Sequence, residues 1–161
     1  MPIVVPKASK LGRNAKFTQA LFDRVVQGTL HAVNLRNKAE VIVEHYRTHV
    51  KHKIGGRAKA MVVTESRLHA VRYKQAFDRY IVDKGYTDVR SLVAFSGIVQ
   101  DPEVPGKNWT EVGMNGGIKE SELPEKFDSA EYQVLLVAES RSKVPTMSAR
   151  AVTIKLSDCQ N

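Results

Sequence analysis

The sequence predicts a three-layer α/β domain built on a parallel β-sheet, spanning residues 55–139. Three short apolar runs, at 58–64, 91–96 and 132–138, do not alternate with polar residues, which is typical of strands covered by helices on both faces. Helical patterns separate these runs, so right-handed strand–helix–strand crossovers are expected. A hydrophobic fraction of 42% in 161 residues is enough for one core and argues against general disorder.

Two helical patterns precede the predicted sheet. Residues 1–33 are a basic lead followed by a weak helix over 16–33, which Gly28 interrupts. Residues 34–54 predict a stronger linker helix, because apolar residues recur on one face and Gly55-Gly56 ends the pattern. That face consists of Leu35, Ala39, Ile42, Val43, Tyr46, Val50 and Ile54.

The remaining elements follow in chain order. The run 58–64 leads directly into a predicted helix over 65–84, which Gly85 ends. The second strand is followed by a Gly- and Pro-rich loop at 97–117 and by a short helix expected over 121–129. After the third strand, the divergent tail 140–161 is rich in Ser and Arg and contains one strand-like run at Ala151–Lys155.

The net charge of +8 is concentrated in the first half of the chain. Residues 1–84 hold 17 Lys and Arg against 6 Asp and Glu, whereas residues 85–161 hold 8 against 11. All five histidines also lie in the first half. This excess favours DNA as a partner, although many globular proteins are basic without binding a polyanion.

Several classes of function are disfavoured. No apolar run has the length of a membrane span and the N-terminus is unlike a secretory signal, so we expect a cytoplasmic protein without a membrane partner. Cys159 is the one cysteine, which rules out an internal disulfide and, with no paired His, a thiol nucleophile. The sequence has no G-x-x-x-x-G-K-[ST] motif and no strand-end Asp-Glu pair for Mg²⁺, so we expect no cofactor in this chain.

The carboxyl ends of parallel strands share one edge of a sheet, where α/β proteins bind their ligands. In this chain those ends carry Thr64, Ser66, Arg67, Ser96, Gly97 and Glu139. Thr64 or Ser66 can cap the next helix, whose first amides attract an anion such as a DNA phosphate, and Arg67 adds a charge. The alternative is that the two hydroxyls only cap the helix and that Ser96-Gly97 only forms a turn.

Two other groups of residues have alternative interpretations. His45, His49 and His52 share one helical surface, but Tyr46 stands where a metalloprotease motif needs Glu, and nearby cations repel a metal ion. A solvated basic face is therefore preferred, and no metal site is predicted. Trp109 can stack on a nucleobase, but burial that pins the loop to the body is favoured.

Long stretches between Asn34 and Glu139 resemble the R subunit (HsdR) of type I restriction enzymes. The matching residues are 38–64, 66–73, 92–97, 112–117, 122–127 and 135–139. That family has a helicase-like motor of two RecA-like domains, with ATP between them and DNA across both. The resemblance implies an incomplete second RecA-like (P-loop NTPase-like) domain, in which residues 60–73 match the motif IV region and 95–97 the strand end near the DNA backbone.

The same resemblance implies what this chain lacks. The parent enzyme uses ATP and Mg²⁺, a first motor domain, and modification and specificity subunits. The Walker motifs, the nuclease domain and the motif VI arginine that stabilises the transferring phosphate have no counterpart here, so the chain alone is expected to be inactive. Residues 1–33 and 140–161 depart from the family pattern, and a reading-frame shift or gene disruption near codon 140 is our hypothesis for the tail.

Two other functions stay open at this point. A stand-alone α/β module would bind a nucleotide or a protein through the acidic C-terminal half and the Gly-rich loop. A metal-binding helix protein would use the histidine group.

Overall fold

The computed structural model describes residues 32–139 and 151–155. In chain order the elements are α2 (Ala32–His45), the π-helical η1 (Tyr46–Val50), α3 (Lys53–Gly56), β1 (Lys59–Thr64), α4 (Arg67–Asp83), β2 (Ser91–Ala94), β3 (Ile98–Gln100), β4 (Asn108–Thr110), α5 (Glu111–Met114), α6 (Leu123–Asp128), β5 (Val134–Ala138) and β6 (Ala151–Lys155). The helix expected over 16–33 and the divergent tail, with Cys159, lie almost wholly outside the described residues.

Four strands form one parallel sheet in the order β2-β5-β1-β6. Leu136 of β5 lies opposite Val62 of β1 and Val93 of β2, so β5 inserts between two strands that precede it in the chain. β6 pairs with the other side of β1, with Val152 opposite Ala60. The predicted α/β class with a small parallel sheet is confirmed, and the sheet takes a fourth strand from the segment 140–161.

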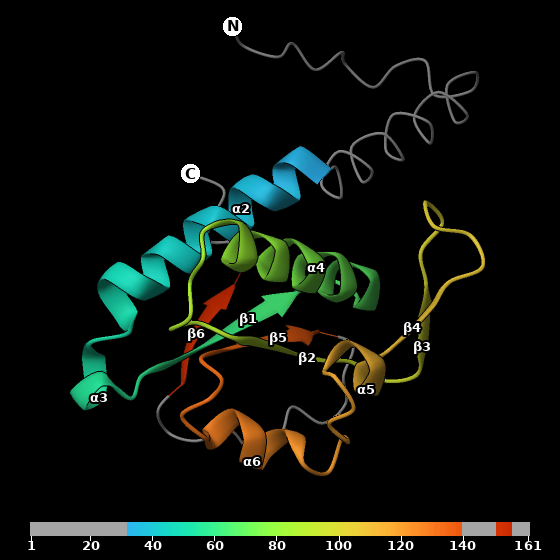
Figure 1. Cartoon of the computed structure of the whole chain (residues 1–161). Helices are drawn as coiled ribbons and strands as arrows, with labels where there is room; N and C mark the ends of the chain where they lie inside the picture. Colours follow the sequence, from blue (N-terminus) through green and yellow to red (C-terminus); the bar gives the residue numbers. More distant parts are fainter. Residues whose placement is uncertain (1–31, 140–150, 156–161) are drawn as a thin grey trace, which may run out of the picture.

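Helices cover both faces of the sheet, as the absence of alternation in the strands predicted. Helices α2 and α4 lie over one face and α6 lies over the other (Figure 1). On the first face Val62, Val93 and Leu136 share a core with Phe77 of α4. On the second face Leu135 packs with Phe127 of α6. Each fully buried side chain of this size contributes about 1.5–3 kcal/mol.

The predicted linker helix is interrupted. It is α-helical only to His45, continues as a π-helical turn, and ends in a short turn where Ile54 has a φ of 53°. A π-helical turn contains more residues than an α-helical turn, and here Tyr46 and Val50 both stay buried within it. The Tyr46 hydroxyl donates to the Ala58 carbonyl at 2.8 Å. Ile54 is 53% exposed, so its place on the buried face was predicted wrongly.

The segment 97–117 is more ordered than a loop. Strands β3 and β4 form a hairpin with Val99 opposite Trp109, and α5 follows directly. The partly buried Trp109 packs against the core beside α4, as the pinning interpretation expects. The buried Asp101 accepts from Arg72 of α4 at 2.6 and 2.9 Å, which fixes the hairpin to the body. Among the described helices, none is both long and apolar enough to cross a membrane.

Candidate functional site

The carboxyl ends of β1, β2 and β5 lie at one edge of the sheet. Glu139 follows β5, and its N–H donates to the Thr64 carbonyl at the end of β1, at 2.9 Å. Arg67 donates from Nη1 to the Ser96 carbonyl at 3.0 Å, which links the start of α4 to the turn after β2. These contacts bring together the six positions named from the sequence, and we call this edge the rim (Thr64, Ser66, Arg67, Ser96, Gly97 and Glu139).

Thr64 faces the interior of the domain. Its side chain is fully buried, and Oγ1 lies 3.1 Å from both the Ser66 and the Val137 carbonyl oxygens, to which it donates. The hydroxyl therefore ties the end of β1 to β5 and to the start of α4. It neither caps the helix nor faces solvent, because its hydrogen atom is used inside the fold.

Ser66 caps α4. Its Oγ accepts from the His69 N–H at 3.2 Å and lies 2.7 Å from His69 Nδ1. The Ala70 N–H makes a backbone bond to the Ser66 carbonyl at 3.0 Å, and the amides of Arg67 and Leu68 come before it. Helix amides in this position have no carbonyl partner within the helix and lie at the positive end of its dipole. The start of this 17-residue helix therefore has the chemistry to bind an anion.

His69 is a rim-side residue that the sequence interpretation passed over. Burial lowers the pKa of His69, and the nearby Glu65 carboxylate partly opposes this effect. Its Nε2 lies 4.0 Å from a Glu65 carboxylate oxygen. His69 comes three residues after the capping Ser66. This spacing is the sequence signal that would have identified His69, because a cap and the residue three positions later meet on the first turn of a helix.

Gly97 makes room for the Arg67 side chain. Gly97 has a φ of +75°, and a Cβ built there would lie 3.2 Å from Arg67 Nη1. A larger residue would crowd the guanidinium and strain the backbone, since side chains disfavour this conformation. The glycine thus helps to hold an exposed arginine across two strand ends.

The parallel sheet itself also favours a site at this edge. From β1 the chain passes to α4 on one face, and from β2 it reaches α6 on the opposite face (Figure 1). β5 separates these two strands, so the general rule that applies is that ligands of open parallel sheets bind outside the carboxyl ends of the strands.

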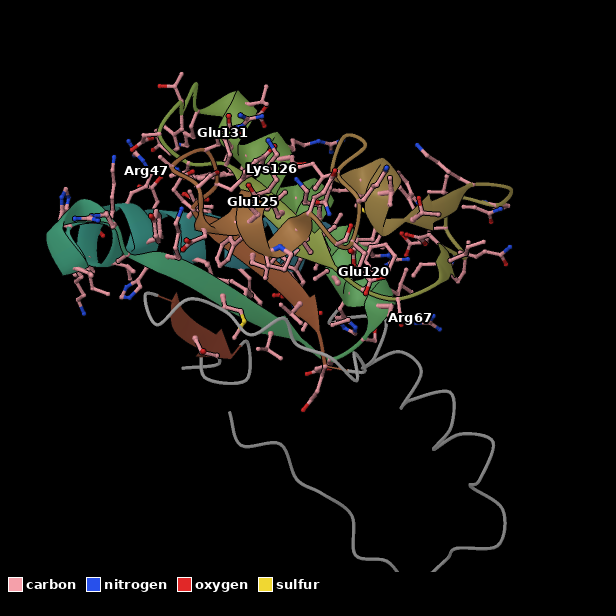
Figure 2. The ribbon with its side chains drawn as sticks, turned by 90° about the horizontal axis from the view of Figure 1, so that it is seen from below. Arg47, Arg67, Glu120, Glu125, Lys126 and Glu131 are labelled. Atoms are coloured by element: carbon pink, nitrogen blue, oxygen red, sulfur yellow. The ribbon has the colours of Figure 1, made fainter. Side chains whose placement is uncertain are left out.

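The charge at the rim is mixed. The exposed Arg67 stands beside the exposed carboxylates of Glu65 and Glu139. The most basic stretch, which includes Arg47, lies at the other end of the molecule (Figure 2). The rim therefore has one guanidinium and the amides of α4 to offer an anion, which suits a single phosphate rather than a long polyanion.

The histidines of the linker helix lie apart from other residues that could bind a metal ion with them, within the ranges that the structure describes. In the described ranges no three His, Cys, Asp or Glu side chains gather as metal ligands. The His45 and His49 rings stack with their centroids 4.9 Å apart, and both are exposed.

Comparisons of the chain with protein-family models, with curated proteins and with solved structures found no match. The class that the structure defines is an α/β protein with a small parallel sheet.

Proposed function

We propose that this chain is part of the second RecA-like motor domain of a type I restriction enzyme R subunit and that its rim contacts the DNA backbone. The sequence resemblance supports this, since it covers β1 and most of β2 and β5. The observation that carries the proposal is the bond from Arg67 to Ser96. It joins the motif IV region to the strand end at 95–97, which the resemblance relates to the DNA backbone.

In this proposal the parts of the rim have different roles. The first amides of α4 and the Arg67 guanidinium hold one backbone phosphate. Ser96 and Gly97 let the DNA strand come close to the protein backbone. Thr64 and Glu139 shape the edge of the sheet through the hydrogen bond between their backbones. The parent complex, in the cytoplasm, supplies the first motor domain, ATP, Mg²⁺, and the modification and specificity subunits. Alone, the chain neither hydrolyses ATP nor cuts DNA.

The test is duplex DNA binding by the full chain carrying Arg67→Glu. Arg79→Glu is the matched control, because Arg79 is an exposed arginine about 18 Å further along the same helix. We expect Arg67→Glu to weaken binding about tenfold or more, since a charge-assisted hydrogen bond contributes about 1.5–3 kcal/mol, and Arg79→Glu to have little effect. Equal affinities for the two variants would remove the rim as a DNA contact.

A stand-alone nucleotide-binding module is the alternative, and one feature favours it. A hollow of about 550 Å³ lies at the amino end of β2. Its lining includes Gly116, the cations Arg90 and Lys126, and Lys74, which pairs with the lining Asp78. This volume is in the range of small-molecule sites. Calorimetric titration with ATP and AMP decides between the two: saturable binding that Arg90→Glu abolishes would favour the module over the motor fragment.

A further inference from the structure

A basic stretch that itself contains no acidic residue lies at the end of the molecule opposite the rim. We call residues 45–57 the basic end; they comprise η1, α3 and the residues beside them. This stretch holds Arg47, Lys51, Lys53 and Arg57 together with three histidines, and no Asp or Glu. β1 begins at Lys59, so the basic end lies at the amino ends of the strands. In Figure 2 Arg47 and Arg67 lie at opposite ends of the molecule.

Two carboxylates from outside the stretch partly neutralise it. Glu44 Oε2 lies 3.9 Å from Arg47 Nη1, and Asp88 makes closer contacts. Asp88 lies 2.6 Å from Lys51 Nζ and 3.3 Å from Arg47 Nε. These partners, Lys51 first, lower the pKa of Asp88, so this carboxylate stays charged and uses up one positive charge. Lys53 and Arg57 are exposed, and no ion pair engages either of them in the part of the chain that the structure describes. Their charges are available to a partner.

The backbone at this end is held in a sparsely populated conformation. Ile54, Gly55 and Gly56 have φ values of 53°, 64° and 78° in succession. For a β-branched residue such as Ile54 this conformation costs about 1–2 kcal/mol. Strain of this kind and π-helical turns both occur preferentially at functional sites. The turn separates Lys53 from Arg57 on an exposed tip instead of continuing the helix.

The opposite charge gathers elsewhere in the body. Residues 85–139 hold 4 Lys and Arg against 10 Asp and Glu, several of them around α6. A polyanion that approaches the body is therefore repelled from the α6 side and drawn to the basic end. The rim, with its mixed charge, has no comparable attraction.

From these observations we infer that the basic end is a binding surface for the phosphate backbone of duplex DNA. Lys53 and Arg57 neutralise phosphates and release counterions, and the exposed histidine rings add hydrogen-bond donors beside them. The surface acts without base-specific contacts and in a salt-dependent way. It is separate from the rim, so it stands whether or not the rim binds DNA.

The test compares two double variants of the full chain by fluorescence anisotropy with a short duplex DNA. Lys53→Glu/Arg57→Glu reverses the two free cations of the basic end. Arg36→Glu/Arg79→Glu is the matched control, because it makes the same change in net charge at exposed arginines outside both surfaces. Melting temperatures measured alongside should be unchanged, since all four side chains are exposed.

We expect the basic-end variant to bind at least tenfold more weakly and its salt dependence to flatten by about 0.9 in logarithmic slope for each lost phosphate contact. The control should stay within a few-fold of the wild type. An equal loss in both variants would mean that only overall charge matters and would overturn the inference, as would no loss in the basic-end variant.

Two further arms separate this inference from its neighbours. If Arg67→Glu weakens DNA binding while the basic-end variant binds normally, the rim proposal survives and this inference falls. If the basic-end variant binds more weakly while Arg67→Glu binds normally, this inference survives and the rim proposal falls. Vesicles of phosphatidylserine and phosphatidylcholine test a membrane surface as the partner. Vesicle binding that depends on Lys53 and Arg57, with no binding of duplex DNA, would replace DNA with an anionic membrane.

Discussion

Asn115 takes the place of a neighbouring strand for Val93. Its Oδ1 accepts from the Val93 N–H at 2.9 Å, and its Nδ2 donates to the Val93 carbonyl at 2.7 Å. Val93 belongs to β2, which lies at the edge of the sheet, and an unpaired edge invites pairing with another chain. Glu111 accepts from the Phe95 N–H further along the same edge. Side chains at both ends of α5 thus satisfy this edge from within the domain.

We predict that Asn115→Leu destabilises the fold by about 2–6 kcal/mol. Two buried backbone groups lose their partners, and each unsatisfied group costs about 1–3 kcal/mol. Urea unfolding measures the change. Asn108→Leu is the control, because Asn108 is exposed and bonds to the Gln100 side chain, and we expect it to change stability by no more than about 0.5 kcal/mol. A comparable loss in both variants would show that Asn115 does not act through the β2 edge.

We predict that Asp101→Asn destabilises the protein at neutral pH and flattens its acid unfolding. Asp101 and Arg72 are both buried, and removing one partner of a buried pair costs about 3–5 kcal/mol. The hydrogen bond from Arg72 holds the pKa of Asp101 below its ordinary value of 3.8. Because the pKa of Asp101 is lower in the folded state, its ionised carboxylate stabilises the fold at pH values above the ordinary pKa. This stabilisation is lost as the pH falls through the lower folded-state pKa.

Unfolding free energies measured from neutral to strongly acid pH test this prediction. Asp83→Asn is the control, because this carboxylate is exposed at the end of α4, and we expect its profile to follow the wild type. An Asp101→Asn profile as steep as the wild-type profile would mean that other carboxylates dominate acid unfolding.

We predict that Tyr46→Phe lowers stability by about 1 kcal/mol at neutral pH, because the Ala58 carbonyl loses its buried donor. Burial, reinforced by Asp88, raises the pKa of Tyr46 to about 12. The raised pKa favours the neutral phenol, so this contribution is complete below pH 10 and is lost as the pH rises through about 12.

Phenolate absorbance during alkaline titration follows Tyr46 directly. The pKa of Tyr80 is also raised, by burial and by its hydrogen bond to Glu44, so Tyr46→Phe should remove one late-titrating component and leave that of Tyr80 in place. Tyr132→Phe serves as the control, because no hydrogen bond engages the Tyr132 hydroxyl within residues 32–139. A normal, early titration of Tyr46 would contradict its burial.

We predict that Gly97→Ala and Gly106→Ala cost similar backbone strain but differ in their effect on the rim. Both glycines have positive φ, +75° and +82°, but only the Cβ at Gly97 meets Arg67, since nothing lies within 4 Å of the Gly106 position. Each substitution should cost about 1–2 kcal/mol. Only Gly97→Ala should also displace the Arg67 guanidinium and weaken any DNA binding that depends on it. Unequal stabilities or equal DNA affinities would count against this.

Local patterns predicted the elements with the largest apolar content. The runs 58–64 and 132–138 became β1 and β5 because strands buried on both faces need continuous apolar residues. The helix 65–84 was predicted nearly to its ends, because Ser66 and Gly85 carry recognisable start and stop signals. The β3–β4 hairpin was missed, since strands of three residues are too short to show a period, and the Pro and Gly between them resemble a plain loop.

Contacts between distant residues decided the rest. The order β2-β5-β1-β6 depends on which strand edges meet, and no single run of residues encodes that. Thr64 was placed on the correct edge, yet its hydroxyl turned inward because the Val137 carbonyl, 73 residues away in sequence, accepts from it. Likewise, charge composition indicated a basic half. Only the folded chain placed Lys53 and Arg57 together at the end opposite the rim. Periodicity and turn residues act over a few positions and determine which elements form, whereas strand pairing and burial join distant positions and determine where each side chain points.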